Sequence, residues 1–194
     1  MLPNAINLKD FFRYKEVVFD KIRLINIGSF VEKKNHKFII EIARELKNRK
    51  INFEIILLGD GPLLNELKEL VVKYQLINEI FFMGVVENVN EHLNNANIYL
   101  HTAKYEPFGL VLLESMAIGL PIISLNGKGN LDIIENNVNG FILNNQNQMD
   151  FCDKIIQLYN SKELYFKISK NAIKKAEIHN MNSYIENLIE LYSS

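Results

Sequence analysis

The sequence predicts an α/β protein: a doubly wound parallel sheet of about six strands, followed by a helical tail. Short apolar runs alternate with amphipathic stretches from residue 22 onward, as in repeated strand–helix units. The apolar runs are nearly continuous, which is typical of strands covered on both faces. The chain has 194 residues and is 48% hydrophobic, so it is long enough to bury a full core.

The apolar runs place the predicted strands, and the spacing of apolar residues places the helices. The strands are "IRLINIG", "FEIILLG", "EIFFMG", "NIYLHT", "PIIS" and "GFIL", which end at Gly28, Gly59, Gly84, Thr102, Ser124 and Leu143. Helices are predicted at 35–49, 62–74, 88–96 and 108–118, and in the tail at 148–159, 161–178 and 182–192. Residues 1–20 show no clean period and are predicted to be a linker or lead-in.

Composition excludes several classes of protein. Lys and Arg number 22 against 23 Asp and Glu, so the charge gives no argument for nucleic acid or an anionic membrane as partner. Cys152 is the single cysteine; it cannot form an internal disulfide and is expected to fill the core, which fits a reducing compartment. No apolar stretch approaches the roughly 18 residues needed to span a bilayer, and the chain is expected to be cytoplasmic.

In an open parallel sheet, ligands bind at the carboxyl ends of the strands, so residues after the predicted strands are candidates. Gly28 and Lys34 follow the first strand, where glycine allows a phosphate to approach and lysine supplies a charge. A turn glycine and a solvated lysine are the alternative. After the second strand, Asp60 and Gly61 fit ordinary turn chemistry as well as ligand contact.

Two carboxylates follow the fourth strand. Glu106 precedes Pro107, which favours an extended loop conformation. Gly109 permits close approach at the first turn of helix 108–118, where free N–H groups favour an anion. Glu114 lies five residues further, about 7.5 Å along a helix. That distance is comparable to the separation of a diphosphate from the ribose hydroxyls of one nucleotide.

Apolar residues flank Glu114 on nearly all sides, so its helix is expected to be buried. An ionised carboxylate there needs hydrogen-bond donors, and a vicinal diol supplies two. The alternative is that Glu114 pairs with a backbone N–H or a lysine of the fold.

The stretch "EPFGLVLLE" resembles the E-x7-E motif of the retaining group 1 glycosyltransferases, family 4 of these enzymes. Further blocks resemble the family in order over about residues 22–145: "IGSFVEKKNHKFIIEIA", "ILLGDGPLLNELKEL", "IFFMGVVENVNEHLNNANIYLHTAKYEPFGLVLLESMAIGLPIIS" and "NNVNGFIL". The resemblance implies one half of a GT-B fold, a Rossmann-like donor-binding domain. It divides the chain into a lead-in (1–20), this domain (21–180) and a crossover helix (181–194), with the N-terminal acceptor domain expected to be absent.

Carried onto this sequence, the resemblance implies two catalytic residues, Lys34 at the donor diphosphate and Glu106 at the donor sugar. Glu114 would hold the ribose hydroxyls. The other implied donor nucleotide-binding residues are Gly28, Ser29, Gly84, Val85, Val86, Gly109, Leu110 and Val111, and the implied cleft lining is Gly61, His101, Thr102 and Phe108. The family usually has Arg where this chain has Ser29, which removes one of two cations at the diphosphate.

The implied reaction moves a hexose from a nucleotide diphosphate sugar, with a UDP-sugar favoured, to a glycan or lipid-linked acceptor. The anomeric configuration is retained and neither metal nor bound cofactor is expected. The chain alone is expected to be inactive, because the acceptor half would lie elsewhere, in the same parent chain or in a separate subunit. Any association with a membrane is expected to come through that missing half. The commonest role of such proteins is bacterial surface polysaccharide synthesis.

Three other interpretations are open. The chain could be the nucleotide-sugar binding subunit of a split transferase. It could be half of a GT-B sugar-nucleotide epimerase, against which the E-x7-E motif argues. It could also be a non-catalytic Rossmann-like scaffold, for which Ser29 is a small argument.

Overall fold

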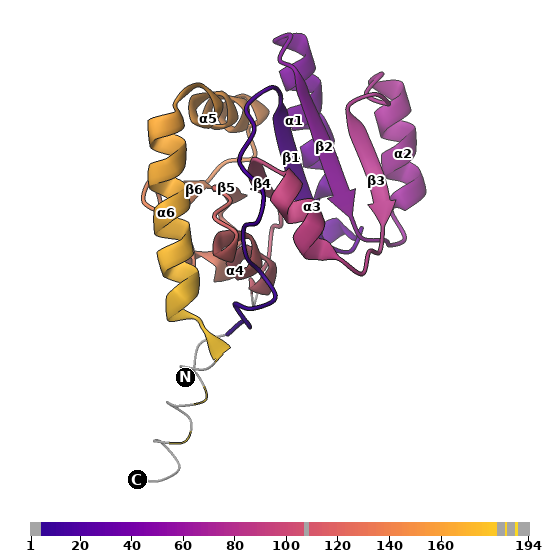
Figure 1. Cartoon of the computed structure of the whole chain (residues 1–194). Helices are drawn as coiled ribbons and strands as arrows, with labels where there is room; N and C mark the ends of the chain where they lie inside the picture. The colour runs from indigo at the N-terminus through magenta and orange to yellow at the C-terminus, as the bar shows by residue number, and fades with distance from the viewer. Residues whose placement is uncertain (1–4, 107–108, 182–184, 186–188, 190–194) are drawn as a thin grey trace.

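The computed structural model describes residues 5–106, 109–181, 185 and 189. Six parallel strands form one sheet in the order β3-β2-β1-β4-β5-β6 (Figure 1). The strands are β1 Ile22–Ile27, β2 Phe53–Leu58, β3 Ile80–Gly84, β4 Ile98–His101, β5 Ile122–Leu125 and β6 Gly140–Leu143. The predicted doubly wound sheet is confirmed. The strand order reverses between β1 and β4, so the loops after these two strands diverge at the centre of one edge.

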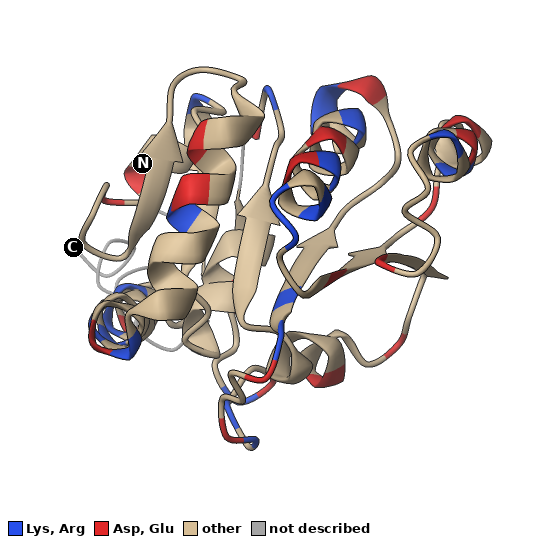
Figure 2. Ribbon diagram, turned by 90° about the horizontal axis from the view of Figure 1, so that it is seen from above, with Lys and Arg blue, Asp and Glu red and all other residues tan. Residues whose placement is uncertain are grey.

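Helices cover both faces of the sheet. The helices α1 (His36–Asn48), α2 (Leu64–Lys73) and α5 (Gln148–Asn160) pack in one apolar cluster. The helices α3 (Val89–Asn95) and α4 (Leu110–Ala117) belong to the cluster on the other face, where α6 (Lys162–Ile178) packs against α4. Basic and acidic residues are intermixed along the outer helices (Figure 2), in keeping with the net charge of −1.

The predicted helices agree with the structure to within a few residues, with three differences. The second helix begins at Leu64, so Pro62 lies in the turn before it. Two short 3-10 helices, η1 (Glu32–Lys34) and η2 (Gly129–Asp132), were not predicted. The predicted helix 182–192 falls largely outside the described residues. Within the described part of the chain, no helix is long and apolar enough to cross a membrane.

Cys152 lies in the core, as predicted. Its side chain is fully buried in α5, and Sγ donates to the carbonyl of Ile42 at 3.6 Å. Burial raises the pKa of this thiol to about 12. Cys152 therefore packs as a small apolar residue and is not a nucleophile.

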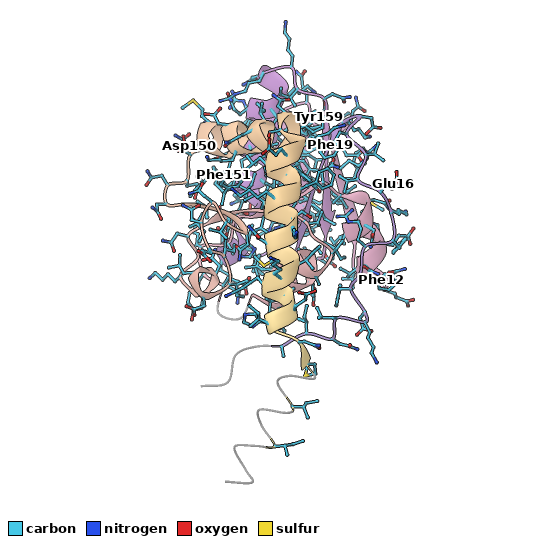
Figure 3. All side chains as sticks on the ribbon, turned by 60° about the vertical axis from the view of Figure 1, so that its left-hand side comes forward. Phe12, Glu16, Phe19, Asp150, Phe151 and Tyr159 are labelled. Carbon is cyan, nitrogen blue, oxygen red and sulfur yellow. The ribbon has the colours of Figure 1, made fainter. Side chains whose placement is uncertain are left out.

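The lead-in is held against the domain by specific contacts rather than connecting to it loosely. Phe19 packs edge-on against Tyr165, with ring centroids 5.1 Å apart, and its carbonyl accepts a hydrogen bond from the Tyr159 hydroxyl at 2.9 Å. Figure 3 shows Phe19 beside Tyr159, where α5 meets α6. Nearer the N-terminus, Ile6 is buried and forms an isolated bridge with Asn180. Local periodicity could not reveal these contacts, because each partner lies far along the sequence.

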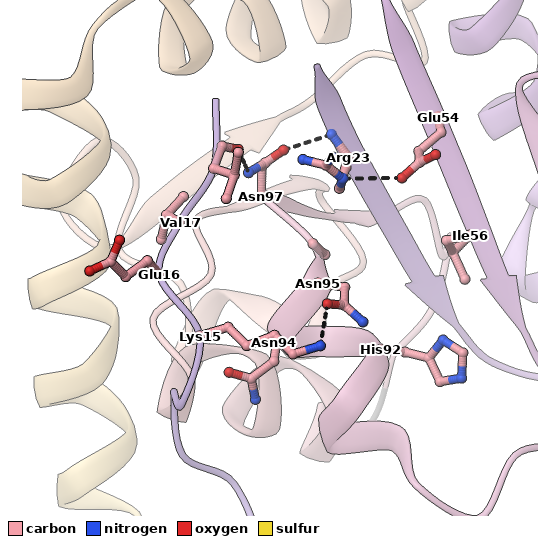
Figure 4. Close-up of a pocket in the computed structure, with 12 residues that line it drawn as sticks. Lys15, Glu16, Val17, Arg23, Glu54, Ile56, His92, Asn94, Asn95 and Asn97 are labelled. Carbon is pink, nitrogen blue, oxygen red and sulfur yellow. Dashed lines mark hydrogen bonds and ion pairs between the residues drawn. The ribbon is translucent and has the colours of Figure 1, made fainter. Parts of the chain in front are cut away.

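Asparagine side chains in and just after α3 also fix the lead-in. The amide of Asn97 accepts from the backbone N–H of Arg23 at 2.7 Å and donates to the carbonyl of Val18 at 2.9 Å (Figure 4). Asn94 accepts from the N–H of Tyr14 at 2.9 Å. Val18, Arg23, Asn94 and Asn97 line a cavity of about 590 Å³ between the lead-in, α3, β1 and β2. The Asn94 and Asn97 side-chain amides thus connect the lead-in to α3 and β1.

Candidate active site at the carboxyl edge of the sheet

The carboxyl edge brings Lys34 and Glu106 into direct contact. Lys34 ends η1 after β1, and Glu106 lies in the loop after β4, the strand beside β1. Lys34 Nζ lies 2.5 Å from Glu106 Oε2, with the Glu106 side chain 8% exposed. The sequence predicted both residues for this edge but did not predict that they form an ion pair with each other.

The main chain around Lys34 is fixed from two sides. Asn35 adopts the left-handed conformation, with φ 57°, and so joins η1 to α1. Thr102, at the end of β4, donates its hydroxyl to the carbonyl of Lys34 at 3.1 Å. Thr102 is fully buried, so it lies beneath Lys34 and supports it. The long Lys34 stem runs past Gly28 and carries its ammonium group out to Glu106.

Three groups surround the Glu106 carboxylate. Oε2 faces both Lys34 and, at 3.6 Å, His101 Nε2, while Oε1 accepts from the backbone N–H of Gly109 at 3.4 Å. Burial acts to raise the pKa of Glu106, but the hydrogen bond and charge of Lys34 outweigh it and hold this pKa below its ordinary value. Glu106 is therefore an ionised, oriented carboxylate at neutral pH.

Gly109 is required by the backbone at the start of α4. Its φ is +63°, and a Cβ added there would lie 2.5 Å from Cδ1 of Ile133. A side chain at this position would be strained by its conformation and by that contact. Phe108, predicted to line the cleft, lies outside the described residues.

Glu114 is half-buried rather than fully buried, which corrects the expectation from the sequence. Leu110 is 43% exposed, and Val111 and Glu114 are partly exposed, so one face of α4 is open. Among the described residues, Glu114 has no hydrogen-bond or ion-pair partner. Burial raises its pKa. The described part of the fold thus offers no internal partner for this carboxylate, which remains available to a ligand.

A cavity of about 310 Å³ opens at the same edge of the sheet, at the ends of β1, β2 and β3. Four predicted nucleotide-binding residues are involved: Gly28, Ser29, Val85 and Val86 line it, together with Ile27, Leu58, Gly59, Asp60 and Val89. Gly84 precedes them with φ +71° and open space around its Cα. The structure therefore gathers the predicted positions from three strand ends at one edge.

Gly61 has a packing role in the structure. A Cβ added there would lie 2.7 Å from the backbone nitrogen and oxygen of Phe30, so the loops after β1 and β2 touch at this glycine. Asp60 accepts the N–H of Gly61 at 2.7 Å. Gly61 is not among the residues lining the 310 Å³ cavity. Its presence in the sequence is explained by this contact between loops.

Sequence analysis missed His36, the first residue of α1. It is 1% exposed, its ring lies edge-on against Phe30 at 4.7 Å, and neither ring nitrogen has a hydrogen-bond partner among the described residues. Burial, with smaller contributions from Lys34 and His101, lowers the pKa of His36 to about 4. His36 directly follows Lys33, Lys34 and Asn35, and this position next to a predicted site residue could have marked it as a candidate. Hydrophobic periodicity only placed it at the start of a helix.

Metal ligation is not supported by any cluster in the described residues. No group of three or more His, Cys, Asp or Glu side chains there is arranged to hold a metal ion. The charges that meet at the edge are those of Lys34 and Glu106.

The fold and this edge define a Rossmann-like domain of the class that binds nucleotides where the strand order reverses. The sequence profile of the glycosyl transferases group 1 matches residues 9–175, and the chain belongs to that family. It is 32% identical over 133 residues to the putative glycosyltransferase EpsF of Bacillus subtilis, covering 63% of this chain and 35% of that protein.

Other relatives agree with this family. A poly(ribitol-phosphate) alpha-N-acetylglucosaminyltransferase of Staphylococcus aureus is 28% identical over 176 residues, covering 87% of this chain and 35% of the enzyme. The chain thus spans about a third of the length of both curated relatives. The resemblance to a transferase family, predicted from the motif, is confirmed.

Solved structures show the same fold. The structure of HepE of Anabaena in complex with UDP and glucose superposes with a TM-score of 0.87 at 18% identity, covering 98% of this chain and 55% of that one. The C-terminal domain of a glycosyl transferase group 1 family protein of Francisella tularensis gives a TM-score of 0.78 at 22% identity, covering 91% of this chain and all of that domain. The chain has the fold of such a C-terminal domain.

Proposed function

We propose that the carboxyl edge binds the nucleotide diphosphate sugar of a retaining hexosyltransferase. The observation that carries the proposal is the meeting of Lys34 and Glu106 at the edge that holds the 310 Å³ cavity, with Glu114 on α4 lacking a hydrogen-bond or ion-pair partner among the described residues. One cation, one oriented carboxylate and one free carboxylate suit a diphosphate, a sugar and a ribose diol respectively. The complex of HepE with UDP and glucose supports this choice of ligand.

In this proposal the base enters the cavity lined by Val85 and Val86, at the end of β3. The contacts would be largely to the backbone, which Gly84 leaves open to approach. Glu114, further along α4, would accept hydrogen bonds from the ribose hydroxyls. UDP is the favoured nucleotide because several structural neighbours were solved with UDP bound.

Lys34 would stabilise the negative charge that develops on the diphosphate as the sugar leaves. The N-terminal turn of α4, where Leu110 and Val111 have N–H groups without a helical acceptor four residues earlier, would add to this stabilisation. Glu106 would face the sugar and orient it. Ser29 supplies no charge at the position where the family usually has Arg, so the diphosphate would depend more on Lys34.

For the whole protein we propose transfer to a glycan or lipid-linked acceptor in bacterial surface polysaccharide synthesis. The S. aureus relative, named for its poly(ribitol-phosphate) acceptor, supports that class of acceptor. The acceptor would be held by a second domain or subunit, as the chain covers only part of its relatives. The free, buried Cys152 fits a cytoplasmic location for this domain.

The test is a calorimetric panel of UDP-, GDP- and ADP-sugars against the chain and its E114Q variant. We expect UDP-sugars to bind and E114Q to weaken binding, because Gln cannot accept two charge-assisted hydrogen bonds from the diol. We also expect no sugar transfer by the chain alone. Failure of every nucleotide sugar to bind would contradict the proposal, and transfer by the chain alone would contradict the need for a second domain.

A further inference from the structure

A buried histidine, His101, lies beside the ion pair of Lys34 and Glu106. His101, the last residue of β4, is 2% exposed, and its Nε2 has no hydrogen-bond partner among the described residues. That nitrogen lies 3.6 Å from Glu106 Oε2, slightly beyond hydrogen-bond distance. Buried polar atoms are usually satisfied, so this one requires an explanation.

The ion pair that Glu106 makes in the free chain competes with the proposed role of Lys34. Lys34 Nζ bonds to Glu106 at 2.5 Å, so a diphosphate that recruits this ammonium group competes with the carboxylate for its charge and its N–H donors. The Lys34 side chain is 20% exposed on a flexible stem and is able to turn outward. Glu106 would then keep only the 3.4 Å contact from the Gly109 N–H, and a buried carboxylate with so little compensation is costly.

We propose that His101 is a positioning residue that takes up a proton as the donor diphosphate draws Lys34 away, and that the resulting imidazolium holds Glu106 in place. This inference rests on the proposed donor site. The proton comes from solvent and binds Nε2, Glu106 stays ionised, and no covalent bond changes. The carboxylate that faces the sugar would keep its orientation while the lysine serves the diphosphate.

The charges around His101 support this direction of change. Four titratable groups face it: Lys34 from η1, Glu106 from the loop after β4, His36 from α1, and Tyr99, whose ring is stacked on it at 6.2 Å. Burial lowers the pKa of His101 to about 4, while Glu106 raises and Lys34 lowers it. The imidazole is therefore neutral in the free chain at physiological pH.

Moving Lys34 to the ligand removes a repulsive charge and leaves the attraction of Glu106, so the pKa of His101 rises in the complex. A group with a higher pKa in the complex makes binding tighter as the pH falls through that value. His36 would feel the departure of Lys34 too, but no carboxylate contact is recorded for it among the described residues. His36 is therefore the matched control.

The experiment is isothermal calorimetry of UDP binding to the full chain at several pH values, at each of them in buffers that differ in ionisation enthalpy. We expect proton uptake, reaching about half a proton per UDP at the pH that equals the bound-state pKa of His101. H101Q places an amide donor near Glu106 that does not titrate, so it should bind UDP with this uptake lost and with a flatter pH dependence. H36Q should keep the uptake. The terminal phosphate of UDP contributes alike to all three proteins and cancels in the differences.

Each outcome separates the inference from the proposed function. Equal uptake by the wild type and H101Q, or loss of uptake in H36Q instead, would overturn the role of His101 and leave the donor site standing. Absence of UDP binding by the wild type would overturn the donor site and this inference with it. Should H101Q not fold, NMR titration of the His101 ring in the wild type answers the same question. Its pKa should be higher with UDP than without, and an unchanged value would contradict the proposal.

Discussion

Replacing Gly109 by alanine tests how the start of α4 is built. Two effects follow from the structure: the φ of +63° and a Cβ placed 2.5 Å from Cδ1 of Ile133. The left-handed conformation costs about 1–2 kcal/mol for a residue with a Cβ, partly offset by about 0.4–1 kcal/mol from the stiffer unfolded chain. Overpacking adds about 1–3 kcal/mol. G109A should therefore be destabilised by about 1–5 kcal/mol.

Gly84 is the matched control, because its φ is +71° but an added Cβ would meet nothing within 4 Å. G84A should lose only about 1 kcal/mol, the conformational cost net of the unfolded-state gain. The I133V substitution removes the methyl group that an alanine at position 109 would meet, so it should recover about 1–2 kcal/mol in the G109A background. Urea unfolding of the wild type and these three variants measures these values. Equal losses in G109A and G84A, with no recovery by I133V, would refute the reasoning.

Three further predictions concern charge, burial and the lead-in. K34M leaves Glu106 buried without its cation, which raises the Glu106 pKa. Thermal unfolding should show that K34M is less stable than the wild type at about pH 7, and that this difference in stability shrinks toward about pH 4 as the carboxyl is protonated. A difference that stays constant with pH would contradict this. Cys152 should resist a thiol reagent until the chain unfolds, and rapid labelling of the folded protein would contradict its burial. N97A should lose about 1–3 kcal/mol of stability and expose the lead-in to protease, because the Asn97 amide holds Val18 and Arg23. The exposed Asn95 should tolerate alanine, and equal effects of the two substitutions would contradict the role of Asn97 in holding the lead-in.

The sequence was sufficient to place Lys34 and Glu106 at one edge. Alternating apolar runs and stripes define strand ends, and in a parallel sheet all carboxyl ends share an edge. Their ion pair was not predictable, because it depends on the short η1 helix and on Asn35 in the left-handed conformation, neither of which follows from hydrophobic period. The spacing of Glu106 and Glu114 similarly identified two candidates without showing that only Glu106 is paired.

The exposure of Glu114 shows a second limit of sequence reasoning. A helix that is apolar nearly all round is expected to be buried, yet the side of α4 bearing Leu110 and Glu114 is open. Which side stays open is decided by α6, the neighbour against which α4 packs from far along the chain. The lead-in contacts of Asn94 and Asn97 were missed for the same reason, because long-range packing leaves no local period.

The proposed donor site depends on Glu114, which we propose binds the ribose of the nucleotide at the carboxyl edge. The most direct measurement is a thermodynamic cycle by calorimetry, with UDP and 2′,3′-dideoxy-UDP binding to the wild type and to E114Q. Each hydrogen bond to a charged acceptor contributes about 1.5–3 kcal/mol, so removing the diol should weaken binding to the wild type at least tenfold. E114Q should lose far less on the same change of ligand. Equal losses by both proteins would contradict the assignment of Glu114 to the ribose.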